Sequence, residues 1–381
     1  MGSRDMIKYP NQIVMKKYFT IFILLLAANP AFSQKRLLDN EHILRAANKC
    51  ITSIYSYDFD EAKKALSEVE DYTPDHPAVL FLKALTIYWE FYPLVPGHPM
   101  EEKYLEHIED CIIISEKWVK KSDKELEAVF FDLFSRAFLS MYWADNGKPG
   151  KVFPHLNTMY RHTMRGFELM DEFNEFFFTT GLYNYYVEAY PEKHPAYKPV
   201  VIFFQKGDKE KGLEQLNYCA DNSIFLRVEA KFFLSIIHLN YEMDFKKASE
   251  YAAELYREFP RNSFYAGKYL EILLYNDKYF LAPVILSNLK KWDDPFSRMQ
   301  YHLYRGLYLE KAEKKHSKAL NEYHKALDIS EQFGVYAGTY QAIAYMGIGR
   351  YHQKKGDQSE ANKYFRMAKN KTVYEYIYTD R

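Results

Sequence analysis

Cysteine, glycine and proline are scarce in this sequence. The 381 residues include only three cysteines, Cys50, Cys111 and Cys219, with no Cys-x-x-Cys pair and no histidine at zinc-finger spacing, which argues against a structural zinc site. We interpret them as small apolar core residues, with one disulfide and one free thiol as the alternative in an oxidising compartment. The 15 glycines and 15 prolines leave few residues for turns, whereas 18% of the chain is aromatic, and this composition favours helices packed on helices.

The sequence also lacks an excess of charge of either sign. Its 51 basic and 51 acidic residues balance, and basic residues cluster only in isolated pairs such as Lys246-Lys247 and Lys290-Lys291. Nucleic-acid binding needs a basic face, and attachment to an anionic membrane surface needs a polybasic segment. We therefore expect no nucleic-acid partner and no electrostatic attachment to a membrane surface. We also predict no stable membrane span in the mature chain.

Catalytic motifs are missing as well. There is no Gly-rich phosphate loop, no His-Glu-x-x-His, no Gly-x-Ser-x-Gly and no calcium-binding loop. His155 and His162 are spaced so that they could share a helix face, but we interpret them as solvated rather than as metal ligands. Asp293-Asp294 beside Trp292 is interpreted as a helix-capping loop before Pro295 rather than as a sugar-binding carboxylate pair. We expect a non-enzymatic protein and assign no catalytic, cofactor-binding or metal-ligating residue.

An export signal is predicted near the N-terminus. Lys16-Lys17 precedes an apolar run from Tyr18 to Ala28, and small residues flank Phe32 before Gln34. This is the layout of a secretory signal peptide with cleavage before Gln34, and the run of about eleven residues is too short to span a bilayer. We predict residues 1–33 as the signal peptide, with Met15 as an alternative start.

A repeated pattern of small and large apolar residues follows. Phe59, Ala62, Leu66, Val69 and Pro74 place an aromatic residue, an alanine, two apolar residues and a terminating proline at fixed spacings, and the same five positions recur as Phe245, Ala248, Ala252, Leu255 and Pro260. Ala282 with Leu286, Ala319 with Tyr323, and Ala361 with Phe365 continue the pattern at intervals close to one repeat length. In the last unit, Gly349 lies in the first helix, and Gly356 is expected at the turn between the two helices, where a left-handed or tight backbone favours glycine. The pattern resembles the tetratricopeptide repeat (TPR) family, whose period is about 34 residues.

A second resemblance covers residues 181–260. The segments GLYNYYVEAYP and KGDKEKGLEQL are similar to the central region of the eukaryotic TPR-like family that includes the inclusion-body-clearance proteins, and Gly212 then occupies the place that alanine holds in other units. This resemblance implies a helical-repeat fold. We divide the mature chain into irregular N-terminal repeats over 34–180, with one clear unit near 41–75, and TPR-like repeats over 181–381.

Tyrosine is unusually abundant, with 35 residues. Tyr183, Tyr186 and Tyr190 are spaced to share one helix face, and tyrosine is enriched in binding surfaces. We assign these three a partner-binding role, with filling of gaps between hairpins as the alternative.

These observations predict an all-α fold, a right-handed α-solenoid of TPR-like hairpins. The packing of its hairpins is assigned to these residues: Ala62, Leu66, Pro74, Gly212, Ala248, Ala252, Pro260, Ala282, Leu286, Ala319, Tyr323, Gly349, Ala361 and Phe365. The predicted function is a cell-envelope scaffold, in the periplasm or at the outer membrane of a diderm bacterium, that holds a protein or peptide partner in its concave surface without a cofactor. The alternatives are an exported glycan-binding protein and an α/α-toroid glycosidase or lyase.

Overall fold

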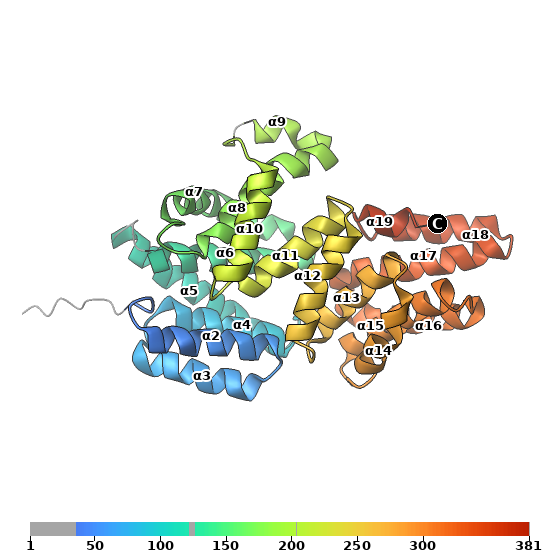
Figure 1. Ribbon diagram of the computed structural model, residues 1–381, viewed down its shortest axis with the longest axis horizontal. Coiled ribbons are helices and arrows are strands. Elements are labelled where there is room, and N and C mark those ends of the chain that lie inside the picture. The colour runs from blue at the N-terminus through green and yellow to red at the C-terminus, as the bar shows by residue number, and fades with distance from the viewer. Residues whose placement is uncertain (1–35, 122–125, 203, 381) are drawn as a thin grey trace, which may run out of the picture.

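The computed structural model describes residues 36–121, 126–202 and 204–380, and this part of the chain is helical without strands (Figure 1). The prediction of an all-α solenoid of TPR-like hairpins is confirmed. The predicted signal peptide and its cleavage site before Gln34 lie outside the described residues. Among the described residues, no helix is both long and apolar enough to cross a membrane.

Consecutive helices pair into antiparallel hairpins that pack on one another in chain order. Over the described ranges, eight such hairpins are formed: α2 (Glu41–Tyr55) with α3 (Phe59–Tyr72), α4 (Pro77–Glu90) with α5 (Glu101–Lys121), α6 (Leu126–Asp145) with α7 (Phe153–Leu169), α8 (Phe176–Lys193) with α10 (Lys209–Asn222), α11 (Arg227–Asn240) with α12 (Phe245–Glu258), α13 (Ser263–Tyr275) with α14 (Ala282–Leu289), α15 (Pro295–Lys311) with α16 (His316–Ser330), and α17 (Gly338–Lys354) with α18 (Gln358–Lys369). The short helices α9 (Lys198–Val201) and α19 (Glu375–Tyr378) lie outside these pairs.

In α12, the second helix of its hairpin, side chains at both ends determine where the helix begins and ends. In α12, the Asp244 carboxylate accepts a hydrogen bond from the backbone N–H of Lys247 at 3.0 Å and so caps the first turn. Ala248, Ala252 and Leu255 recur at four- and three-residue spacing and are buried on one face. Phe259 and Pro260 follow the last turn, and the proline cannot continue a helix.

The small residues of the repeat lie where two helices cross. Ala62, Ala248, Ala282 and Ala361 are each fully buried. At Gly212 the approach is closer still, since a Cβ added there would lie 2.7 Å from the backbone nitrogen of Tyr185. Of the residues assigned to packing, only the prolines Pro74 and Pro260 are exposed, in the turns after α3 and α12. The predicted boundary between residues 180 and 181 falls inside α8.

In most hairpins, a residue with a left-handed backbone conformation lies in the turn just before the second helix. Positive φ angles occur at Tyr57, Met243, Asp277, Lys314 and Gly356, each at the same position before the alanine of its unit. Gly356 was expected to take this conformation. At the other four positions a side chain occupies a region that costs of order 1 kcal/mol or more, so the hairpin geometry overrides the local preference.

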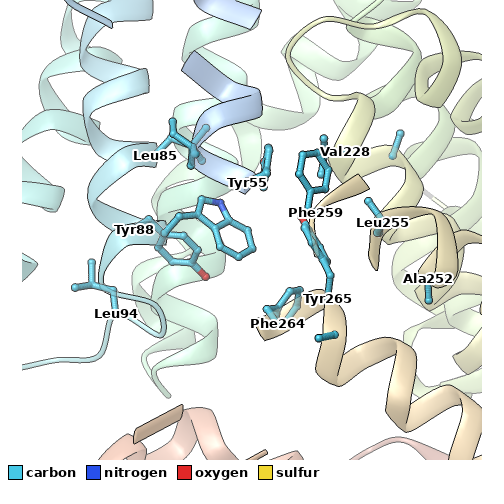
Figure 2. Close-up of a cluster of buried hydrophobic side chains, with 14 of the residues drawn as sticks. Tyr55, Leu85, Tyr88, Leu94, Val228, Ala252, Leu255, Phe259, Phe264 and Tyr265 are labelled. Atoms are coloured by element: carbon cyan, nitrogen blue, oxygen red, sulfur yellow. The ribbon is translucent and has the colours of Figure 1, made fainter. Parts of the chain in front are cut away.

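The N-terminal hairpins close onto the middle of the chain. Figure 2 shows side chains of α2 and α4 facing those of α12 and α13 across one shared cluster, with Tyr55 and Tyr88 on one side and Phe259 and Tyr265 on the other. The Tyr55 ring lies 5.7 Å from Phe259. At the cluster's edge, the Asn262 side-chain amide donates a hydrogen bond to the carbonyl of Tyr55 at 3.1 Å. The first two hairpins of the described chain therefore pack against the fifth and sixth, and we call this contact the closure.

The C-terminal segment is anchored to three first helices. The Tyr376 hydroxyl donates a hydrogen bond to buried Glu271 of α13 at 2.5 Å. Asp380 forms an ion pair with Lys311 of α15 at 2.8 Å, and its backbone carbonyl accepts a hydrogen bond from Arg350 of α17 at 2.7 Å. The segment around α19 thus ties α13, α15 and α17 together.

Candidate partner-binding surfaces

The surface expected to hold a partner is lined by the first helix of each hairpin, and here those helices contact one another. Trp89 of α4 lies 5.8 Å, ring to ring, from Phe264 of α13. Tyr92, just after α4, packs edge-on at 5.3 Å against Phe296 of α15, and its hydroxyl is hydrogen-bonded to that of Tyr336 in the 3₁₀ helix η4 (Glu331–Ala337). Around this cluster, the chain's own aromatic side chains occupy the space that a bound peptide would take.

An open groove lies between second helices instead, and we call it the α12–α14 groove. It has a volume of about 610 Å³. Its apolar lining consists of Tyr256 from α12, Tyr269 from α13, and Leu281, Val284 and Ile285 from the start of the next second helix. Because the turn Tyr279–Leu281 is a 3₁₀ helix followed by Pro283, α14 has only eight residues.

Some side chains of the α12–α14 groove are fixed by contacts with their neighbours, and others are exposed to solvent. The Asn288 amide donates to the Tyr256 hydroxyl at 2.7 Å, and the Tyr256 and Tyr269 rings lie 5.7 Å apart. Burial raises the pKa of the Tyr269 hydroxyl. Val284 is 62% exposed and the neighbouring Phe280 is 76% exposed. A large apolar side chain exposed in a groove, as Val284 is here, is typical of an interaction site.

Charged residues form the rim of this groove. Glu250, Glu254 and Arg257 line it. Glu254 forms an ion pair with Lys231 at 3.1 Å, and the Arg257 guanidinium donates to the carbonyl of Ala253 at 3.2 Å. Of the two acidic groups on the rim, Glu254 is thus paired with Lys231, whereas Glu250 has no ion pair among the described residues. Sequence reasoning assigned Ala282 and Leu286 to packing but missed Phe280 and Val284, although both stand out as apolar residues on the helix face opposite the repeat positions.

The three tyrosines assigned to a partner lie in different environments. The Tyr183 hydroxyl donates to the carbonyl of Gln205 at 2.7 Å, which fixes the connection after α9. Tyr186 is half-buried, and its ring packs edge-on against Tyr241 at 5.2 Å. Tyr190 is 36% exposed and lies 4.4 Å, ring to ring, from His194. They do not share one exposed face, and their role in partner binding stays a prediction.

The two histidines considered as a metal pair belong to a buried charge network. His162 contacts the Asp132 carboxylate at 2.7 Å, and Asp132 is also paired with Arg136 at 3.0 Å. His155 lies 3.1 Å from Arg136, and its pKa is lowered by burial and by the guanidinium charge. The interpretation of both histidines as solvated was wrong for His162, which is buried. Within the described ranges, no group of three or more His, Cys, Asp or Glu side chains is arranged to hold a metal.

The features considered for glycan chemistry have structural roles. The Asp294 carboxylate accepts a hydrogen bond from the backbone N–H of Ser297 at 2.8 Å and caps α15, which confirms the capping interpretation. Trp89 and Trp143 are buried, and Trp118 and Trp292 are half-buried. Cys50, Cys111 and Cys219 are buried free thiols, which agrees with their interpretation as core residues.

No family model and no curated protein matches the chain. Similar solved structures include a monomeric mutant of IFIT1 with m7Gppp-AAAA, at 12% identity and TM-score 0.35, over 86% of this chain and 60% of that one. They also include the human IFIT1 dimer with PPP-AAAA, at 13% identity and TM-score 0.36, over 87% and 94% of the two chains. Yeast Tom70 matches at 12% identity and TM-score 0.23, over 88% and 93%. The chain thus spans about 60% of the IFIT1 mutant's length. Identities and scores this low establish neither a family nor a function.

Proposed function

We propose that this protein is a non-enzymatic scaffold that binds a protein or peptide partner in the α12–α14 groove. The observation that carries the proposal is the apolar groove itself, in which the lining residue Val284 is 62% exposed. We assign binding to this groove rather than to the concave surface. Where α4, α13 and α15 meet, their aromatic side chains contact one another across that surface.

The groove's lining defines the chemistry of the partner. Apolar side chains of Tyr256, Leu281 and Ile285 would contact one aliphatic or aromatic anchor, as in other small recognition grooves. The Glu250 carboxylate on the rim would favour a basic residue beside that anchor. The proposed occupant is therefore a segment of a partner protein in which an apolar residue neighbours a lysine or arginine.

The test is capture of the partner from solubilised envelopes of the host, followed by affinity measurement with the purified partner. Val284→Asp should weaken binding at least about tenfold, since a carboxylate would be desolvated against the partner's apolar anchor. Val373→Asp is the matched control, because Val373 is 74% exposed and outside the groove. A partner that binds both variants like the wild type would contradict the proposal, and so would the lack of any stoichiometric partner.

We further propose that the protein is exported to the cell envelope, in the periplasm or at the outer membrane of a diderm bacterium. The support is the signal-peptide pattern of residues 15–33. N-terminal sequencing of the protein recovered from host envelopes should read from Gln34. A chain that keeps Lys16-Lys17 in a soluble cytoplasmic fraction would contradict export.

A further inference from the structure

A second groove, separate from the α12–α14 groove, is lined by lysines. It has a volume of about 490 Å³ and lies where the turn between α15 and α16 meets the end of α17. The basic residues that line it are Lys314, Lys315, His316, Lys318, Lys354 and Lys355, and we call it the lysine groove. In the sequence, Lys314-Lys315 and Lys354-Lys355 are two separate pairs. Stacking of adjacent hairpins brings Lys314-Lys315 and Lys354-Lys355 together.

Most of this charge has no counter-ion. Lys315 is paired with Glu313 at 2.5 Å. In the part of the chain that the structure describes, no carboxylate lies within ion-pair distance of Lys314, Lys318 or Lys355, and Lys354 contacts only the ring nitrogen of His316, at 2.5 Å. The pKa of His316 is lowered by burial and then by the charge of Lys354. Positive groups crowded in this way repel one another, and a bound anion would relieve that repulsion.

We propose that the lysine groove binds a phosphoryl group carried by a small phosphate ester. Lysine ammonium groups act as point charges toward phosphate oxygens, and several can converge on one phosphoryl group. The groove's volume suits one head group rather than an extended chain. The ester could be a soluble metabolite or the head group of an anionic lipid, which share this chemistry.

The experiment compares the full-length protein with two triple variants of equal charge. One is Lys314→Gln/Lys318→Gln/Lys354→Gln in the groove, and the other changes three exposed lysines elsewhere, Lys103, Lys246 and Lys290, to Gln. Glycerol phosphate is titrated by NMR, with the amide signals of Ser317 and Tyr351, two groove residues that no variant changes, as reporters. Vesicles of phosphatidylcholine with and without phosphatidylglycerol are tested by co-sedimentation. The wild type and both variants carry the same N-terminal apolar run. Any vesicle binding by this run is therefore equal in all three proteins and does not affect their comparison.

The groove variant should bind at least about tenfold more weakly than the wild type, since charge-assisted hydrogen bonds are lost, and the control variant should be unchanged. Binding of glycerol phosphate alone supports a soluble ester, whereas added binding to phosphatidylglycerol vesicles supports a lipid head group. Equal binding by both variants, or no binding of either probe, overturns the proposal. Tighter, groove-dependent binding of polyglutamate or of an RNA oligonucleotide overturns it in favour of that partner.

Discussion

Trp89→Ala is expected to lower the free energy of unfolding by about 3–5 kcal/mol, the range for truncating a large buried aromatic side chain. Trp89 is 8% exposed, and its ring contacts come from both sides of the closure. It stacks on Tyr92 at 4.9 Å and meets Tyr55 edge-on at 5.2 Å. The facing α13 contributes Phe264 and Tyr265. Denaturant unfolding followed by circular dichroism measures the loss.

The control for this prediction is Phe153→Ala. Phe153 is 72% exposed at the start of α7, so its truncation should change stability by no more than about 0.5 kcal/mol. If Trp89→Ala were as mild as Phe153→Ala, the aromatic cluster would not be packed, and the inner faces of the first helices would be open to a partner after all.

Glu271→Ala is the second variant with a large expected effect, a loss of about 3–5 kcal/mol, the range for leaving a buried charge uncompensated. Glu271 is fully buried and accepts hydrogen bonds from the hydroxyls of Tyr304 at 2.6 Å and Tyr376 at 2.5 Å, with the Lys268 ammonium 3.3 Å away. Removing the carboxylate leaves two hydroxyls and a cation without their acceptor in the interior. The measurement is again equilibrium unfolding.

Limited proteolysis adds a readout specific to the C-terminal segment. Because α19 is anchored through Tyr376 to Glu271, the substitution should make the chain after Thr372 cleavable before the rest of the fold. Glu331→Ala, at an exposed carboxylate, should alter neither stability nor cleavage. Full protection of residues 373–380 in Glu271→Ala would show that this hydrogen bond does not hold the segment.

Local pattern in the sequence predicted most of the fold. The spacing of Ala248, Ala252 and Leu255 predicted α12 with its buried face. Such predictions succeed because helix pairing depends on residues three or four apart and on neighbours within one repeat.

The closure could not be predicted from the sequence, because it depends on the rotation of each hairpin relative to the one before it. These rotations add up along the solenoid. Tyr55 and Phe259 lie more than half the chain apart in sequence, and nothing in either unit marks its distant contact. The tyrosines assigned to a binding face illustrate the same limit, since Tyr186 packs against Tyr241 of the following hairpin. The lysine groove was missed for a related reason, because each lysine pair was judged alone, while the repeat period places equivalent turns side by side.

The most direct test of the closure is a double-mutant cycle between Trp89 and Phe264, which are distant in sequence and belong to the facing helices α4 and α13. Unfolding free energies are measured for the wild type, both single alanine variants and the double variant. A packed aromatic pair should show a coupling energy of about 0.5–1.5 kcal/mol. A coupling indistinguishable from zero would contradict the account, because it would mean that the N-terminal hairpins do not close onto the middle of the solenoid.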